Sequence, residues 1–215
     1  MHPLIIIHDK MRIESRDEKI INVPLPEANG TDNWRETGQR AYKLQCGREA
    51  YEIHCPEVQT ENGRVLIVPT LIIPGMRYPV YVYIYAVTVY SANPEMGQRE
   101  AAKLTKEYFG LETFSHTTLG RAMKKVEALI ADGAEGTGSE SATQQREAKR
   151  FPSVEEMQER KKAVLSYIKE AAGKEGLALP EPKPPQPRPP YTGAFIDACH
   201  RISAYAYKKH GRLLL

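Results

Sequence analysis

Apolar residues between positions 97 and 130 recur at helical spacing in two runs, and a turn separates the runs. The first run predicts an amphipathic helix whose inner side carries Ala101, Leu104, Thr105 and Tyr108. Gly110 suits the left-handed position that commonly ends a helix. The pattern therefore predicts that a second helix begins shortly after this glycine.

The second helix is predicted to begin at Ser115, whose side-chain oxygen can cap the free amides of the first turn. Its apolar stripe consists of Leu119, Ala122, Met123, Val126, Leu129 and Ile130. Its outward positions are His116, Thr117, Gly120, Arg121, Lys124 and Lys125. Two helices arranged in this way are typical of a helix-turn-helix, in which the second helix enters the major groove of DNA.

Cations and small polar groups occupy the outer face of this second helix. Three cations and no carboxylate occur between Ser115 and Val126, and this balance favours contact with phosphate. Arg121 is predicted to read a guanine, while Lys124 and Lys125 are predicted to lie over the DNA backbone. The full set of predicted DNA-binding residues is Arg99, Lys103, Ser115, His116, Thr117, Thr118, Arg121, Lys124 and Lys125. An ordinary helical hairpin with a solvated basic face is the alternative.

Two features depart from the usual helix-turn-helix pattern. The linking segment 110–114 is longer than the usual three- or four-residue turn. Gly120 lies in the middle of the second helix, where glycine costs about 1 kcal/mol relative to alanine. This glycine either permits the close approach of a backbone or has no special role.

Residues 1–79 are predicted to form a β-rich module built on a small antiparallel sheet. Its expected strands are Leu4–His8, Ile20–Val23, Tyr42–Cys46, Tyr51–Cys55 and Arg64–Ile73. The sequence ENGR at 61–64 predicts a hairpin. Pro69 and Pro74 place the last run at a sheet edge or in an extended connection, because proline lacks the amide hydrogen that a central strand donates.

Local preference and architecture disagree over Val80–Asn93. The alternating β-branched and aromatic residues favour a strand. A helix-turn-helix, however, needs a third helix to cover its apolar stripes, and this run is the only upstream candidate, so we expect a helix. The tyrosines of this region are expected to pack in the core, with a nucleobase-stacking platform as the alternative; they are Tyr78, Tyr81, Tyr83, Tyr85 and Tyr90.

Composition changes after Ile130. Residues 132–143 are rich in Gly, Ser, Ala and Glu and predict a flexible linker. Ser153 and Glu156 then form a capping-box pattern at the start of a helix that ends near Gly173. The apolar stripe of this helix is expected to contain Val154, Met157, Val164, Leu165 and Ile168.

Seven prolines occur in the twelve residues 179–190, which predict an extended polyproline spacer or a docking peptide. The final predicted helix, Ala194–Lys209, carries an apolar face of Phe195, Ile196, Cys199, Ile202 and Ala206. This face needs a partner, which is either the body of the domain or a second copy of the chain. We take the terminal helix as the candidate interface of a possible homodimer.

The expected fold class is α+β. The expected organisation is a β-rich module at 1–79, a helix-turn-helix domain at 80–131, a linker at 132–152, a helix at 153–173, the Pro-rich spacer at 179–190 and a C-terminal helix at 191–215.

The charge of the whole chain is compatible with a nucleic-acid partner. The formal net charge is +3, and residues 151–215 carry eleven Lys and Arg against seven Asp and Glu.

The longest apolar stretch, Val80–Tyr90, is too short to cross a bilayer as a helix. We therefore expect a cytoplasmic protein with no membrane partner.

The three cysteines are Cys46, Cys55 and Cys199, and they are not closely spaced. Reduced, buried thiols are the expected state, with zinc held by Cys46, Cys55 and His54 as the weaker alternative. Phosphate loops, nucleophile elbows and paired metal-ligand motifs are absent from the sequence. We therefore expect no cofactor, no metal and no enzymatic activity.

The stretch from Arg64 to Leu129 resembles an uncharacterised bacterial transposase-like family. In that family a short zinc-ribbon-like β module precedes an L-x-P-x-x-x-x-P-x-x-R-Y connection and a helix-turn-helix. The matching positions of the connection are Val68, Pro69, Pro74, Arg77 and Tyr78, and the string S-H-T-T-L-x-R at 115–121 is similar to the start of the family's recognition helix.

The paired C-x-x-C zinc ligands of the family are missing here, so its zinc site does not carry over. The resemblance implies a DNA-binding protein related to mobile elements. Together with the helix-turn-helix pattern and the absence of catalytic motifs, it leads us to expect sequence-specific binding of double-stranded DNA by a transposase-like or mobile-element-associated regulator without a catalytic domain. A protein-interaction or assembly factor that uses the helical hairpin and the Pro-rich segment is the alternative function.

Overall fold

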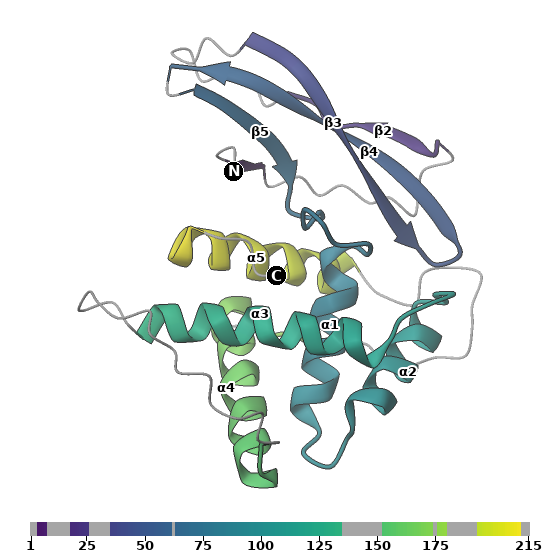
Figure 1. The fold of residues 1–215 in the computed structure, drawn as a ribbon, viewed down its shortest axis with the longest axis vertical. Coiled ribbons are helices and arrows are strands. Elements are labelled where there is room, and N and C mark those ends of the chain that lie inside the picture. Colours follow the sequence, from purple (N-terminus) through teal and green to yellow (C-terminus); the bar gives the residue numbers. More distant parts are fainter. Residues whose placement is uncertain are drawn as a thin grey trace.

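In the computed structural model, a five-stranded sheet precedes five helices, which confirms the α+β class (Figure 1). The structure describes residues 4–7, 18–25, 35–61, 63–134, 152–173, 176–179 and 193–211. The expected flexible linker and the Pro-rich spacer fall almost entirely outside the described residues.

The sheet is organised around its longest hairpin. Its strands are β1 (Leu4–Ile7), β2 (Ile20–Asn22), β3 (Arg35–Cys46), β4 (Glu49–Thr60) and β5 (Gly63–Pro69). Antiparallel β3 pairs along the length of β4, while β5 and β2 share the opposite edge of β4. The predicted hairpin between β4 and β5 is confirmed, because Thr60 pairs with Gly63, whose φ of 114° is one that glycine tolerates.

Two expectations about the sheet are wrong. The sheet is mixed rather than antiparallel, since β1 runs parallel to β5 and β2 runs parallel to β4. Only the tight turns at Gly47 and Gly63 force antiparallel pairing, whereas long connections join β1 and β2 to their partners. β5 is also not an edge strand, because it pairs with both β4 and β1; Pro69 is tolerated because it is the last residue of the strand.

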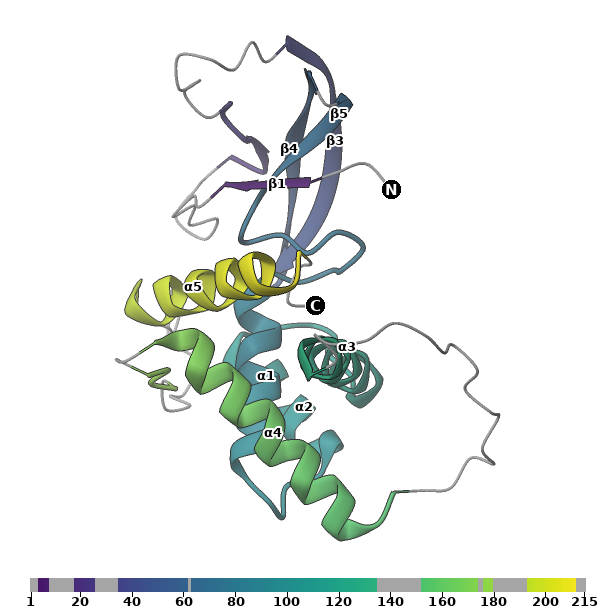
Figure 2. The ribbon, with the colours of Figure 1, turned by 90° about the vertical axis from the view of Figure 1, so that its left-hand side faces the viewer.

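The helices are α1 (Val80–Ala92), α2 (Gln98–Tyr108), α3 (His116–Ala134), α4 (Val154–Ala172) and α5 (Gly193–His210). α1 contacts each of the other four helices. In Figure 2 it runs through the middle of the helical part, with α3 on one side and α4 on the other. α3 also continues past residue 131, the expected end of the helix-turn-helix domain.

The expected helix at Val80–Asn93 is confirmed, although the local sequence prefers a strand. Every residue from Val80 to Ser91 is buried, so α1 has no polar face. A helix that is apolar all round is stable only inside a protein core, and the surrounding helices provide that core. Tertiary packing therefore overrides the β propensity of this segment.

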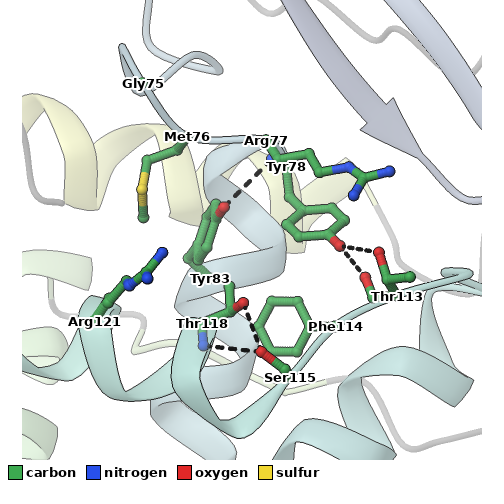
Figure 3. Close-up of a pocket in the computed structure, with 10 residues that line it drawn as sticks. All are labelled: Gly75, Met76, Arg77, Tyr78, Tyr83, Thr113, Phe114, Ser115, Thr118 and Arg121. Carbon is green, nitrogen blue, oxygen red and sulfur yellow. Dashed lines mark hydrogen bonds between the residues drawn. The ribbon is translucent and has the colours of Figure 1, made fainter.

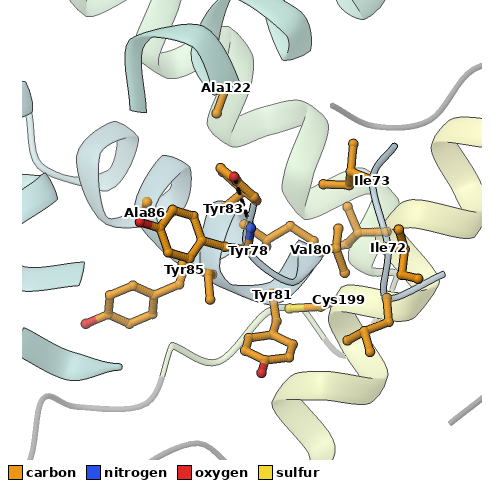
Figure 4. Packing of buried hydrophobic residues seen from close by; sticks show 14 of the residues in the cluster. Ile72, Ile73, Tyr78, Val80, Tyr81, Tyr83, Tyr85, Ala86, Ala122 and Cys199 are labelled. Carbon is orange, nitrogen blue, oxygen red and sulfur yellow. Dashed lines mark hydrogen bonds between the residues drawn. The ribbon is translucent and has the colours of Figure 1, made fainter. Parts of the chain in front are cut away.

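The tyrosines of α1 pack inside the protein, as Figure 4 shows for Tyr81, Tyr83 and Tyr85. Tyr85 stacks on Tyr108 with ring centroids 4.5 Å apart and planes 8° apart. Burial raises the pKa of Tyr85 to about 12. The packing interpretation is confirmed, and these rings do not form an exposed platform for nucleobases.

α4 begins with the predicted capping box. The Glu156 amide donates to Ser153 Oγ at 3.1 Å, and the Ser153 amide donates to Glu156 Oε2 at 2.7 Å. The predicted apolar stripe is wrong at its start, because Val154 is 65% exposed and Met157 is 40% exposed. Both residues lie in the first turn of α4, while the deeper Val164 and Ile168 are buried as expected.

The apolar face of α5 packs against the body of its own chain. All five residues of the predicted face are buried, and α5 contacts α1, α3 and α4. The body of the domain is therefore the partner of this apolar face, and a homodimer through the terminal helix stays a prediction. Among the described helices, none combines the length and the apolar character needed to cross a bilayer.

The segment Thr70–Pro79 joins the sheet to the helices and is itself anchored on both sides. The Gln45 amide donates to the Arg77 carbonyl at 2.8 Å, and the Val80 amide donates to the Leu71 carbonyl at 2.9 Å. Thr70 also forms a hydrogen bond with His200 of α5. These contacts fix the position of Arg77 and its neighbours relative to the helices.

Candidate nucleic-acid interface

The turn between α2 and α3 has a defined geometry despite its length. Gly110 adopts a φ of 60° and its amide donates to the Glu107 carbonyl at 3.3 Å. The Leu111 amide reaches back to the Lys106 carbonyl at 2.9 Å. These two hydrogen bonds form a Schellman motif, so the predicted end of the first helix at Gly110 is confirmed.

Hydroxyl groups surround the start of α3. The Thr118 amide donates to Ser115 Oγ at 3.2 Å, which confirms the predicted cap. The same oxygen lies 2.7 Å from Thr117 Oγ1 and 3.0 Å from Thr118 Oγ1. Three hydroxyls and the positive end of the helix dipole therefore meet at one point of the surface.

The two faces of α3 have the predicted character. Its apolar stripe is buried from Leu119 to Leu129, while Arg121, Lys124 and Lys125 are exposed. Desolvation by the surrounding protein lowers the pKa of Lys125, although its side chain still reaches the surface. The exposed face of α3 is therefore cationic at neutral pH.

Glu127 lies beyond the cationic run and belongs to the border of this face. Burial raises its pKa, while the nearby Arg160 and Lys124 oppose that effect. The Glu127 carboxylate is thus influenced by cations of α4 and α3. Arg121 has no carboxylate partner among the described ion pairs.

Gly120 lies against α2, not against the outer surface. A Cβ atom at this position would lie 3.3 Å from Oε1 of Gln98, the first residue of α2. The glycine therefore allows α2 to pack closely on α3. This contact accounts for a mid-helix glycine without any role in ligand binding.

A pocket of about 390 Å³ opens beside the start of α3. Ser115, Thr118 and Arg121 line one side of it, and the segment Gly75–Tyr78 lines the other. Figure 3 shows Arg121 beside Met76 and Arg77 next to Tyr78, with the tyrosine rings between the two arginines. None of the lining residues is acidic, so the pocket is electropositive.

Two tyrosines form the wall between these arginines. Tyr78 donates from its hydroxyl to the Thr113 carbonyl and lies 3.0 Å from Thr113 Oγ1. Tyr83 is only 1% exposed, and its hydroxyl oxygen accepts the Tyr78 amide at 3.4 Å. Burial raises the pKa of Tyr83 to about 12, so its hydroxyl keeps its proton at neutral pH.

The structure brings most of the predicted site residues together. Seven of them lie on α3 or at its cap: Ser115, His116, Thr117, Thr118, Arg121, Lys124 and Lys125. The other two, Arg99 and Lys103, are exposed on α2, where Lys103 lies 3.9 Å from Glu107. No hydrogen bond or ion pair among the described residues joins these two to α3.

Sequence reasoning did not assign the pocket residues Arg77, Tyr83 and Thr113 to the site. Gly75, with a φ of 81°, marks the turn that precedes Arg77, but no local pattern connects that turn with α3. The pairing depends on tertiary contacts such as the one between Tyr78 and Thr113, which are 35 positions apart.

The cysteines of the sheet do not form a shared site. Cys46 pairs with Glu49 at the tip of the β3–β4 hairpin, whereas Cys55 pairs with Arg40 farther along the same strands. His54 instead has its Nε2 atom 2.7 Å from Glu52 Oε1. Burial raises the pKa of Cys55 to about 12, so its thiol stays protonated at neutral pH.

No protein-family model, curated protein or solved structure matches this chain. The site is therefore interpreted from its own chemistry. An exposed helix face with one arginine and two lysines, next to a hydroxyl-lined helix start, can bind phosphates and donate hydrogen bonds to base edges.

Proposed function

We propose that this protein binds double-stranded DNA in a sequence-specific manner through the helix pair α2 and α3. The observation that carries the proposal is the exposed face of α3, on which Arg121, Lys124 and Lys125 project without a carboxylate between them. The buried stripe on the opposite side holds this face rigidly against the protein core. Rigid presentation reduces the entropy lost on binding.

The residues of the face have different roles in this proposal. Arg121 lies one turn into α3, where its guanidinium can donate two hydrogen bonds to a guanine in the major groove. Lys124 and Lys125 contact the backbone and contribute affinity without sequence information. Thr117 and Thr118 supply hydroxyls to a phosphate or a methyl contact to thymine.

The proposal extends to the biological class of the protein. The resemblance of the connection and of the recognition-helix start to transposase-like proteins supports a regulator associated with mobile elements. In this proposal the protein recognises DNA and catalyses no reaction, and its partner is the DNA duplex. The helical hairpin with the Pro-rich segment as a protein-interaction module is the competing function.

Selection from a pool of randomised duplexes tests sequence-specific binding. The wild-type protein should enrich one motif, and Arg121→Ala should bind that motif about 10-fold to 100-fold more weakly while binding scrambled duplexes almost normally. Lys106→Ala, which removes an exposed cation of α2 outside the predicted set, is the control and should keep the preference.

Three results would count against the proposal. Failure of the folded wild-type protein to bind any duplex at low salt would exclude DNA as the partner. A preference that survives Arg121→Ala unchanged would show that another residue reads the sequence. A complex with a protein partner that is insensitive to salt would favour the competing function.

A further inference from the structure

The pocket beside α3 has the chemistry of an anion site. Arg77 and Arg121 stand on its two sides and form no ion pair with a described residue. The Arg77 guanidinium lies 5.9 Å from the centre of the Tyr78 ring, a contact that leaves its hydrogen-bond donors available. Two arginines without carboxylate partners therefore flank one cavity.

The wall of the pocket supplies neutral hydrogen-bond donors. Ser115 and Thr118 contribute hydroxyls at the start of α3, where the first amides of the helix have no carbonyl partner within the helix. Tyr83 adds a buried hydroxyl that accepts the Tyr78 amide, and its own hydrogen is not donated in any described hydrogen bond. Tyr83 lines the pocket (Figure 3), so its hydroxyl is a candidate donor for a bound anion.

The size and composition of the pocket favour a phosphate group over a halide or a carboxylate. A volume of about 390 Å³ exceeds the need of a bare halide and falls in the range of small-molecule sites. Arginine forks match the oxygens of a phosphate or a carboxylate, and several hydroxyls together with a helix N-terminus favour the phosphate. The aromatic rings leave an apolar wall for the group that the phosphate carries.

We propose that this pocket binds a phosphate ester, with Arg77 as its charged contact and the hydroxyls of Ser115, Thr118 and Tyr83 as its neutral donors. Arg121 adds positive potential from the opposite side of the pocket, and its hydrogen-bond donors stay available to a guanine base. The inference deepens the proposed function, and it rests on that function where it takes DNA as the source of the phosphate. A backbone phosphate of the bound duplex is the occupant if α3 contacts DNA, whereas a free phosphorylated small molecule is the other source of the same chemistry.

Nuclear magnetic resonance of the full-length protein, labelled with nitrogen-15, tests the pocket without DNA. Inorganic phosphate, added at constant ionic strength, should shift the amide signals of residues 113–118 with saturation in the millimolar range. Arg77→Gln and Tyr83→Phe should weaken this binding about fivefold or more, which corresponds to the loss of one hydrogen bond. Arg48→Gln removes an exposed arginine at the β3–β4 turn and should leave the binding unchanged.

The same variants, titrated with a duplex, identify the source of the phosphate. If the occupant is a DNA phosphate, Arg77→Gln should reduce the slope of log affinity against log salt by about 0.9, and Arg48→Gln should not. If phosphate binds as predicted but the wild-type protein has no affinity for any duplex, the pocket takes a free phosphate ester and the proposed function fails.

The pocket assignment itself is overturned in two ways. Phosphate could leave the signals of residues 113–118 unshifted in the folded protein, or Arg48→Gln could weaken phosphate binding as much as Arg77→Gln does. Either result rejects the pocket even if the protein binds DNA, so the failure of one proposal is separable from the failure of the other.

Discussion

Lys161 of α4 forms hydrogen bonds with the turn that follows α1. Its replacement by methionine measures how much these bonds contribute to the free energy of unfolding. The side chain is 4% exposed, although it lies on a helix that is otherwise polar on its outer side. Its ammonium donates to the carbonyls of Asn93, Pro94 and Met96, each at 2.9 Å. It also lies 4.1 Å from the centre of the Tyr90 ring.

The expected cost follows from opposing contributions. A hydrogen bond from a charged donor contributes about 1.5–3 kcal/mol and a desolvated cation–π contact about 2 kcal/mol, but burying the ammonium costs several kcal/mol. Burial also lowers the pKa of Lys161, and Glu95 offsets part of that effect. Methionine keeps the packing of the stem, and water can reach the carbonyls of the exposed residues Asn93 and Pro94. We therefore expect Lys161→Met to lower the free energy of unfolding by about 2–3 kcal/mol.

Thermal and urea unfolding, followed by circular dichroism, check this value. A loss of about 2–3 kcal/mol corresponds to a fall in Tm of about 5–10 °C for a chain of this size. The matched control is Lys162→Met, since Lys162 is the next residue and bonds only to Glu159 on the surface. Its Tm should stay within about 2 °C of the wild-type value. Equal stability of the two variants would refute the role assigned to the buried lysine.

Two further predictions concern stability. Gly120→Ala should raise the free energy of unfolding by about 0.5–1 kcal/mol in urea titrations, because alanine has a higher helix propensity than glycine. The added Cβ atom would lie 3.3 Å from Oε1 of Gln98, and the flexible end of that side chain can move away. A loss of stability would mean that Gln98 cannot move. In the alkaline range, stability should fall as pH rises from about 10 toward 12, because burial raises the pKa of Tyr83, Tyr85 and Tyr167 from 10.0 to about 12 and their contribution is complete only below pH 10. Tyrosines nearer the surface, such as Tyr205 and Tyr207, can ionise while the protein is folded. The phenolate absorbance of the three buried tyrosines should instead appear as a later step that coincides with the unfolding seen by circular dichroism; completion of this step before unfolding would contradict their burial.

Local signals in the sequence predicted the elements that depend on neighbouring residues. The capping box at Ser153, the helix end at Gly110 and the hairpin at Gly63 each need only a few adjacent positions, and all three are confirmed. The helix at Val80–Ala92 was predictable only from the need of α2 and α3 for a covering helix, since its own residues prefer a strand.

Long-range pairing escaped sequence reasoning for a physical reason. Nothing local in β1 indicates that it pairs in parallel with β5, because the pairing partner lies about sixty positions away. The burial of Lys161 depends on hydrogen bonds to three carbonyls of another segment. Lysine is usually exposed, so the periodic pattern of α4 predicts a surface position for it. The pocket likewise joins 75–78 to 113–121, so only the α3 half of the candidate site was visible in the sequence.

The central claim is that the exposed face of α3 contacts DNA, and a charge-matched pair of triple variants tests it most directly. One variant replaces Arg121, Lys124 and Lys125 with alanine. The other replaces an arginine and two lysines that are exposed away from α3, namely Lys43, Arg48 and Lys169. Fluorescence anisotropy with a labelled duplex, in salt from about 50 to 200 mM, gives the affinity and the salt slope of each protein.

The account predicts steep salt dependence for the wild-type protein and for the variant altered outside α3. For the α3 variant it predicts a slope that is smaller by about 2–3 and a large loss of affinity at every salt concentration. An equal loss of affinity in the two variants would show that DNA binding depends only on the total charge of the protein. Unchanged binding by the α3 variant would place the DNA contact on another surface and contradict the account.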